Sequence, residues 1–328
     1  MNTCNAELHR LCKDVAVSAE NTIKDTKCKK NAAEQAGMRA CNIRDCAAIM
    51  KYFAFLEAEL AKEDHQMDEF TGARMIDEEF RGQGELHCGP SFKTISSIGA
   101  NGAIIHYKPQ ADSAVRLNDR EIYLLDSGGQ YLDGTTDITR ATLFGPSSAI
   151  TAEQKEAYTR VLLGCLDLER IVWPSTSTIA GGDMDILARK NLWEAGLDYK
   201  HGTGHGVGSH LCVHEGPYGV GRGYRFKFVE GMCVSNEPGF YKEGEFGIRI
   251  ENVIMCVPHP QHAGFYMWEN LTVAPYSRNL IELDLLSPRD IRFIDAFHAK
   301  CLEKLTPLLE GDQRALDYVR RQCAPLSA

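Results

Sequence analysis

Five side chains that can bind metal ions lie in order along the chain, each within a stretch rich in glycine. They are four carboxylates and one imidazole: Asp126, Asp137, His205, Glu237 and Glu251. Such a hard, oxygen-rich set favours manganese or cobalt over a structural zinc site built from thiolates. Two metal ions about 3.5–4 Å apart typically activate a water for hydrolysis. The residue types therefore predict a dinuclear metallohydrolase.

The first two carboxylates fit the two arms of one hairpin. Asp126 ends an apolar strand, and Asp137 follows eleven residues later. Between them, Asp133-Gly134 is a turn signal. A turn centred near residues 131–132 would place the two carboxylates opposite each other, with Cβ atoms about 5 Å apart. Taken alone, this pair is explained more simply as turn or capping residues.

The last two carboxylates follow the same pattern. Glu237 and Glu251 are centred on Gly244, so a second hairpin would present a second carboxylate pair. Their neighbours include apolar residues, and unpaired carboxylates are costly to bury among such side chains. A shared cation explains these two residues better than a solvated face does.

Two histidines four residues apart lie in a segment too rich in glycine for a helix. His201 and His205 belong to the sequence His-Gly-Thr-Gly-His-Gly-Val-Gly, which is typical of extended backbone that approaches a ligand closely. Alternation along such a segment points both rings to one face, so one can bind metal while the other contacts substrate. His106 and His214 lie beside glycine and proline turns, where a structural role explains each of them equally well.

Composition excludes two broad classes of function. The chain has 328 residues and a formal net charge of −9, with acidic and basic residues interspersed, which argues against binding to nucleic acid and against a polybasic membrane anchor. No segment approaches the roughly 20 apolar residues of a spanning helix. The polar segment 1–30 is unlike a secretory signal, and the twelve cysteines form no Cys-x-x-Cys pair. We expect a cytoplasmic protein with free thiols.

The order of periodic segments predicts the fold class. Residues 1–30 are interpreted as a tail or linker remnant, so the predicted domain covers 31–328. Helical patterns cover 31–62, 68–81, 151 to before Pro174, 184–195 and 288–309. A capping box of Thr151 and Gln154 opens the third of these helices, and Ser287 is the candidate N-cap of the last. Strand patterns cover 92–107, 121–144 and 211–257. This order predicts an α+β domain assembled from two similar halves, with metal ligands from both.

At these residues the chain closely resembles the aminopeptidase P family, the Xaa-Pro aminopeptidases within the pita-bread, or methionine-aminopeptidase-like, metallopeptidases. The resemblance runs from about Lys24 to the C-terminus and is nearest to the eukaryotic cytosolic branch. Its most specific stretches are 126–128 with 133–140, 201–208, 213–217, 236–239 and 247–252. It implies a pita-bread catalytic domain over 31–328, with two pseudo-symmetric α/β halves around a dinuclear metal site.

The resemblance also implies a role for each metal-binding candidate. Asp126 would chelate one metal ion, while His205 and Glu237 would bind the other. Asp137 and Glu251 would bridge the two ions. Glu237 would serve in addition as general base towards the bridging water. The implied cofactors are two divalent ions, with Mn²⁺ the first expectation and Co²⁺ or Zn²⁺ as alternatives.

Further residues are assigned to the substrate by the same resemblance. Three histidines would bind it and stabilise the tetrahedral intermediate: His106, His201 and His214. Arg249 matches a family arginine near the site, which orients the bridging carboxylates or the substrate. The implied substrates are peptides with proline in the second position. Homodimerisation through the catalytic domain is a further expectation by resemblance.

Two departures and several alternatives remain open. Relatives of this branch normally carry two further N-terminal domains, and this chain begins at what would be the linker into the catalytic domain. His210 stands where relatives usually have an apolar residue and is expected to be a surface histidine. Prolidase-like dipeptidases and methionine aminopeptidases share the five ligands, but the segments around His205 and His214 resemble aminopeptidase P. A non-catalytic pita-bread binding module is another alternative; such proteins have lost metal ligands, whereas all five are present here.

Overall fold

A computed structural model describes residues 6–15 and 21–326 of the chain, and every structural statement below concerns those residues. Its α-helices are α1 (Ala6–Cys12), α2 (Thr22–Lys27), α3 (Ala32–Leu60), α4 (Glu69–Met75), α5 (Ala152–Glu169), α6 (Gly181–Trp193), α7 (Pro288–Leu309) and α8 (Gln313–Gln322). Its strands are β1 (His87–Pro90), β2 (Ile95–Ile98), β3 (Tyr123–Ser127), β4 (Gly129–Tyr131), β5 (Gly134–Thr135), β6 (Ile138–Thr142), β7 (Val172–Pro174), β8 (Gly204–Gly206), β9 (Glu215–Val220), β10 (Cys233–Asn236), β11 (Gly239–Lys242), β12 (Phe246–Arg249), β13 (Asn252–Pro258) and β14 (Phe265–Asn270). Shorter turns are the π-helical η1 (Ile76–Arg81) and the 3₁₀ segments η2 (Gly99–Ala103), η3 (Ser147–Ala149), η4 (Arg278–Leu280) and η5 (Leu283–Leu285).

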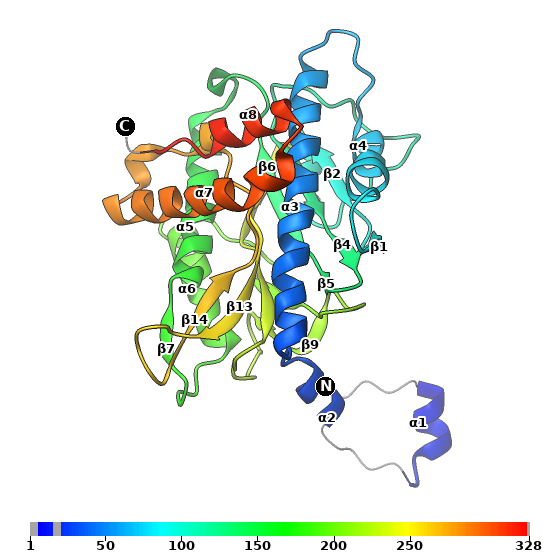
Figure 1. The fold of residues 1–328 in the computed structure, drawn as a ribbon, viewed down its shortest axis with the longest axis vertical. Coiled ribbons are helices and arrows are strands. Elements are labelled where there is room, and N and C mark those ends of the chain that lie inside the picture. Colours follow the sequence, from blue (N-terminus) through cyan, green and yellow to red (C-terminus); the bar gives the residue numbers. More distant parts are fainter. Residues whose placement is uncertain (1–5, 16–20, 327–328) are drawn as a thin grey trace.

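The long helix α3 runs along the molecule beside the strands, and α7 and α8 pack against it (Figure 1). Asn31 caps its first turn by accepting hydrogen bonds from two backbone N–H groups, while the Glu34 carboxylate accepts from the Asn31 N–H. Tyr52 and Phe53 are buried in the main hydrophobic cluster, together with side chains of α5, α7 and α8. The helix predicted over 31–62 is confirmed.

A first long antiparallel hairpin extends from β3 to β6. β3 pairs with β6, and β4 pairs with β5, in a single register centred between Leu132 and Asp133. β2 adds beside β3 and β1 adds beside β4, which gives two three-stranded sheets. Asp126 lies opposite Thr139 and diagonal to Asp137, so the predicted direct pairing of the two aspartates is wrong by two residues. Because the shift is two residues, both carboxylates still share one face.

Contacts from α3 explain where this first hairpin turns. Gly37 lies against the hairpin tip, where an added Cβ atom would come within 2.0 Å of Asp133 O. Arg44 donates to the Asp133 carboxylate at 2.5 Å. These partners are far from the hairpin in sequence, so the local turn signal located the turn within one residue but did not set its register.

A second long hairpin extends from β10 to β13. β10 pairs with β13, and β11 pairs with β12, in one register centred on Gly244. Gly244 has a φ of +73°, a left-handed conformation that glycine adopts at no steric cost. Continuing this register places Glu237 opposite Glu251, where the hairpin passes from one sheet to the next. The predicted hairpin centred on Gly244 is confirmed.

The second half of the chain builds a six-stranded sheet in the order β7-β14-β13-β10-β8-β9. A second hydrophobic cluster joins this sheet to α5 and α6, with Leu168 and Met184 from the helices packed near Val234, Ile254 and Trp268 from the strands. The strand region predicted over 211–257 therefore resolves into the separate strands β9 to β13. Helices and sheets in both halves confirm the α+β class.

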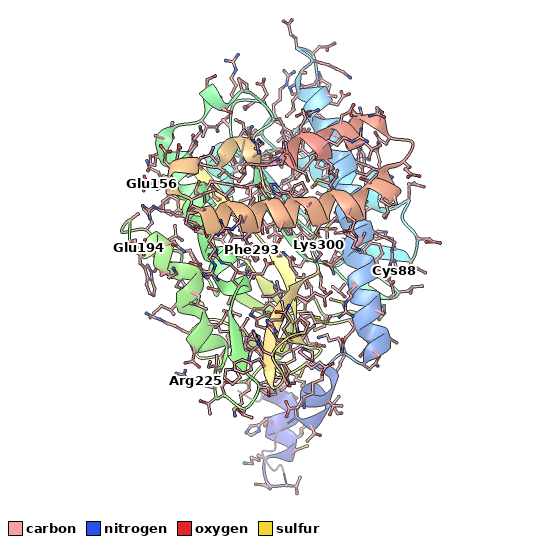
Figure 2. All side chains as sticks on the ribbon, turned by 60° about the vertical axis from the view of Figure 1, so that its left-hand side comes forward. Cys88, Glu156, Glu194, Arg225, Phe293 and Lys300 are labelled. Atoms are coloured by element: carbon pink, nitrogen blue, oxygen red, sulfur yellow. The ribbon has the colours of Figure 1, made fainter. Side chains whose placement is uncertain are left out.

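The remaining helices agree with the sequence in most cases. The helix predicted over 68–81 is α4 continued by η1, and the capping box predicted at Thr151 and Gln154 opens α5. The helix predicted over 184–195 is α6, which begins three residues earlier. α7 has the predicted bounds and the predicted Ser287 cap. It lies across the outer face in Figure 2, with Phe293 and Lys300 along its length.

Other predictions of secondary structure were wrong or incomplete, and β1, β7 and β14 lie outside the predicted strand ranges. The strand predicted over 92–107 is limited to β2, because η2 follows and packs on β12 so closely that a Cβ at Gly247 would lie 1.7 Å from Gly102 O. α8 was not predicted, although its buried Ala315, Leu316 and Val319 have helical spacing. None of the described helices is long and apolar enough to cross a membrane.

Candidate metal centre and active site

The residues singled out from the sequence come together around one pocket of about 370 Å³. Its lining includes Asp126, Asp137, His205, Glu237, Glu251, His106, His201, His214 and Arg249. The ligand candidates come from the two hairpins and from β8, while the other histidines come from loops next to η2, β8 and β9. His210 is exposed and does not line the pocket, as predicted for a surface histidine.

Ligand atoms of the five metal-binding candidates lie close enough to share cations. Asp126, Asp137 and Glu251 bring one carboxylate oxygen each within 4.8 Å of one another. His205, Glu237 and Glu251 form a second group at the same separations. Because Glu251 belongs to both groups, the arrangement suits two neighbouring divalent ions that share a carboxylate.

The imidazole of His205 is held with one nitrogen towards the carboxylates. Its Nδ1 lies 3.0 Å from Gly206 O, which can only accept a hydrogen bond, so Nδ1 carries a proton. Nε2 then faces Asp137 Oδ2 at 3.3 Å and Glu237 Oε1 at 3.5 Å. Ser235 Oγ accepts from the His205 backbone N–H at 2.9 Å and donates to Glu237 Oε1 at 3.0 Å. Nε2 is therefore the atom that a metal ion would coordinate.

Each hairpin supplies side chains that hold the carboxylates of the other hairpin. Arg249, from β12, forms a buried ion pair with Asp126 Oδ2. Thr139, from β6, donates to Glu251 Oε2 at 2.6 Å and accepts from Arg249 Nε at 3.2 Å. Asp126 Oδ1 is buried and has no hydrogen-bond partner among the described residues. A buried carboxylate oxygen without a donor is the state expected of a cation ligand.

Burial and crowding raise the pKa values of these groups. Burial raises the pKa of Asp137 to about 6 and that of Glu237 to about 7. Burial and then the charges of Asp137 and Glu237 raise the pKa of Glu251 well above its ordinary value. Burial alone would lower the pKa of His205, but its hydrogen bond to Asp137 and the charge of Glu237 raise it to about 9. Divalent ions would displace these protons and neutralise the crowded carboxylates, so the donor set fits such ions.

A hydrogen-bonded chain joins His201 to Arg249 through Tyr241. Burial, together with the charge of Arg249, lowers the pKa of His201 to about 4, so the imidazole is neutral at pH 7. Its Nδ1 donates to Gly202 O at 2.7 Å, and its Nε2 therefore accepts from the Tyr241 hydroxyl at 2.9 Å. The same hydroxyl accepts from Arg249 Nη1 at 2.8 Å. His201 is thus fixed in one orientation at the pocket wall.

Tyr241 and Thr139 were not singled out from the sequence. Tyr241 lies four residues after Glu237, and Thr139 lies two residues after Asp137. Alternation along a strand puts residues at these spacings on the same face as the ligand. The signal was therefore present once the hairpins had been proposed.

His106 and His214 are exposed residues of the pocket lining and come from different directions. His106 follows η2, whose close packing on β12 brings the loop to the second hairpin. The His214 ring lies 4.1 Å from the His205 ring, measured between centroids. One nitrogen of His214 also lies within 4.8 Å of ligand atoms of Asp137 and His205, so the geometry alone permits a ligand role as well as a substrate role.

Comparisons with known proteins identify the family. A model of metallopeptidase family M24 matches residues 36–258, and a model of the C-terminal region of peptidase M24 matches residues 264–326. The chain belongs to metallopeptidase family M24. The M24 match contains all nine candidate site residues.

Several M24 proteins of known structure or curated name are similar to this chain. A probable Xaa-Pro aminopeptidase P of Laccaria bicolor is 44% identical over 96% of this chain and 49% of its own length. An X-prolyl aminopeptidase of Caenorhabditis elegans, described as a cytosolic enzyme with a di-nuclear active site, aligns with a TM-score of 0.86 at 34% identity, covering 93% of this chain and 49% of its own. The dipeptidase PepE of Mycobacterium ulcerans aligns with a TM-score of 0.66 at 27% identity, covering 83% of this chain and 66% of its own.

These likenesses confirm the pita-bread fold predicted from the sequence. The chain spans about half the length of the curated relatives it matches.

Proposed function

We propose that this M24 chain is a dinuclear metal-dependent aminopeptidase that removes the N-terminal residue from peptides with proline in the second position. The observation that carries the proposal is the single pocket in which the five ligand candidates, the three histidines and Arg249 meet. The names of the Laccaria and Caenorhabditis relatives support the substrate class. The description of the Caenorhabditis enzyme as cytosolic supports a cytoplasmic location.

Two divalent ions would be held by the crowded donor atoms. Asp126 would bind one ion, His205 and Glu237 the other, and Asp137 and Glu251 would bind both. The two carboxylate-containing groups that share Glu251, and the buried Asp126 Oδ1 without a donor, support this division. When bound, the ions would polarise the scissile carbonyl and activate a water. The hard donor set favours manganese, with cobalt and zinc as alternatives.

The protein's own groups would handle the proton and the developing charge. Glu237 would accept the proton of the attacking water, and the hydrogen bond from Ser235 keeps its carboxylate in one orientation. His106 and His214 would donate to the oxygen that gains negative charge, a contribution of about 3 kcal/mol for one donor. The neutral His201, held in one orientation by Tyr241, would contact the substrate as part of the pocket wall.

Apolar side chains in the pocket suit recognition of a proline ring. Phe92, Ile95 and Ile105 line the pocket next to the polar groups. A Xaa-Pro bond has no N–H to donate, so the site must recognise the shape of the ring. These three side chains provide a surface of that kind.

A prolidase-like dipeptidase is the second candidate, favoured by the structural likeness to the dipeptidase PepE. The five ligands do not separate the two activities, because the metal chemistry is the same. They differ in substrate length: an aminopeptidase accepts residues after proline, whereas a dipeptidase requires a free carboxylate on it.

Substrate length and metal dependence can be tested together. Metal-stripped protein would be assayed with and without added Mn²⁺ on a Xaa-Pro-Pro peptide, a Xaa-Ala-Pro peptide and a Xaa-Pro dipeptide. The proposal predicts that release of the first residue will require Mn²⁺. It also predicts that only the Xaa-Pro-Pro peptide will be cleaved, or that it will be cleaved much faster than the other two peptides. Cleavage of the dipeptide alone would establish the dipeptidase instead.

Metal content separates the remaining outcomes. Failure to bind Mn²⁺, Co²⁺ or Zn²⁺ in calorimetry would contradict the proposal and favour a non-catalytic binding module. Two bound ions without cleavage of any of the three peptides would contradict the proposed activity for this chain. Homodimerisation stays a prediction, which sedimentation velocity would test.

A further inference from the structure

A buried lysine just before α3 has its whole hydrogen-bonding capacity used inside the domain. Lys30 Nζ donates to Glu215 Oε2 at 2.6 Å, to Tyr218 Oη at 3.0 Å and to Cys28 O at 3.3 Å. The Lys30 side chain is fully buried and that of Glu215 is 6% exposed. The Lys30 backbone is also held, because its N–H donates to Gly231 O at 3.1 Å.

Glu215 connects this ion pair to the pocket. It is the first residue of β9 and follows His214 directly in the chain. Its backbone pairs with Gly206, next to His205, so closely that a Cβ at Gly206 would lie 2.0 Å from Glu215 O. Glu215 therefore links β8, which carries His205, to the start of β9, which directly follows His214.

The carboxylate of Glu215 also supports the loop between those histidines. A Cβ added to Gly208 would lie 3.2 Å from Glu215 Oε1. That oxygen has no hydrogen-bond partner among the described residues, and the exposed Lys27 lies 3.8 Å away. Lys30 is therefore the cation that fixes the direction of the Glu215 side chain.

Stability alone does not account for a pair of this kind. Replacing a buried ion pair by well-packed apolar residues is often neutral or stabilising, whereas removing one partner is strongly destabilising. What the charges add is a fixed direction for both side chains. In this fold, that direction sets the start of β9.

We infer that Lys30, through its buried ion pair with Glu215, is a positioning residue that holds His214 at the pocket. The segment 28–30, which precedes the domain boundary expected from the sequence, thereby takes part in building the active site. The inference rests on the proposed function, because it takes His214 as a substrate contact. Lys30 itself touches neither the substrate nor the ligand candidates.

The test compares single and double substitutions in the full chain. Lys30→Met leaves Glu215 buried without its cation and is expected to destabilise the fold. Lys30→Met/Glu215→Met replaces the pair by apolar side chains and is expected to melt close to the wild type. Its kcat/KM on a Xaa-Pro-Pro peptide should still fall about 10- to 100-fold, mostly in kcat, because a small misplacement of a catalytic contact has effects of that size.

The chain offers a control ion pair on the same sheet, with side chains that are 39% and 31% exposed instead of buried. Arg39, in α3, donates to Glu269, in β14, at 2.7 and 2.9 Å, and so joins α3 to a strand of the same sheet that carries no pocket residue. Arg39→Met/Glu269→Met should change neither kcat nor KM. Loss of activity equal to that of the Lys30 double variant would mean that any link to this sheet matters, which would overturn a specific role for Lys30.

A second readout separates this inference from the proposed function. In protein labelled at histidine, the His214 ring signals, assigned with His214→Asn, should shift in the Lys30 double variant and stay in place in the control. These signals decide the positioning role even if the wild type cleaves no Xaa-Pro peptide. Wild-type kinetics with unchanged His214 signals in the double variant would overturn the inference, and so would a double variant that does not fold.

Discussion

The two long hairpins present the same chemistry by different means. Each places a carboxylate pair where it passes from one sheet to another, but Glu237 lies directly opposite Glu251, whereas Asp126 lies diagonal to Asp137. The second hairpin turns at a left-handed glycine, while the tip of the first is held by contacts from α3. The register of a hairpin can be predicted from sequence when residues of the turn itself determine it. When contacts from distant segments determine the turn, the register is predicted only approximately.

The hairpins also depend on each other. Arg249 of the second holds Asp126 of the first, and Thr139 of the first holds Glu251 of the second. Each donor would keep its partner carboxylate oriented towards the metal ions. The site is therefore a property of the pair of hairpins, and its two supports differ in strength: one is an ion pair and the other a single hydrogen bond.

The largest effect is expected at the ligand that also acts as base. Glu237→Gln should keep the fold but lower kcat by roughly 10²–10⁴-fold, because it weakens a ligand and removes the proton acceptor together. Glu243→Gln, at the exposed tip of the same hairpin, should leave kcat unchanged. Steady-state kinetics on a Xaa-Pro-Pro peptide measure both, and near-wild-type turnover by Glu237→Gln would contradict its assignment.

The two cross-hairpin supports should differ when each is removed. Arg249→Met leaves the Asp126 carboxylate in a buried site without its cation. This substitution should lower the free energy of unfolding of the metal-free protein by about 3–5 kcal/mol. Thr139→Val removes the hydrogen bonds to Glu251 and from Arg249 without leaving a buried charge unpaired, and should cost about 1.5–3 kcal/mol. Urea unfolding with a chelator present measures both, and equal losses would mean that the ion pair has no special weight.

The pH dependence of metal-free stability distinguishes the hairpins further. Burial raises the pKa of Asp137 to about 6 and that of Glu237 to about 7 in the folded protein, against ordinary pKa values of 3.8 and 4.5. A raised pKa gives stability that is present below the ordinary value and is lost as pH rises through the folded value. The pKa of His205 is raised from 6.5 to about 9, and this shift acts in the same direction.

The melting temperature with chelator should therefore fall as pH rises from about 5 to 9, and added Mn²⁺ should restore more stability at the upper end. Asp137→Asn should remove the part of the fall below pH 7, and Glu237→Gln the part around pH 7. Differential scanning calorimetry across this range measures the effect. A metal-free melting temperature that rises with pH over the same interval would show that these groups are not protonated in the folded state.

The smallest effect is expected at the tip of the second hairpin. Gly244 has a φ of +73°, and among the described residues only its chain neighbours come within 4 Å of an added Cβ, so Gly244→Ala meets only backbone strain. The cost should be about 1–2 kcal/mol in unfolding free energy, without loss of activity. Thermal melts and peptide assays check both parts, and a large loss of activity would show that the hairpin register depends on this one residue.

Much of the fold follows from local sequence signals. The caps at Thr151 and Ser287, the bounds of α7 and the hairpin around Gly244 depend on residues within a few positions of each other, and all were predicted. α8 was missed despite its spacing, and the strand expected up to residue 107 ends at Ile98. The latter could not be predicted, because η2 owes its conformation to packing against β12.

The candidate site shows the same division. Sequence alone determined which residue types are available for metal binding and that they alternate onto one face of each hairpin, since strand periodicity and turn position are local properties. Only the tertiary structure decided that Arg249 reaches Asp126, that the loop of His106 lies beside the second hairpin, and that Lys30 supports Glu215. These contacts join segments far apart in the chain, and their geometry is set by packing of the whole domain rather than by any local pattern.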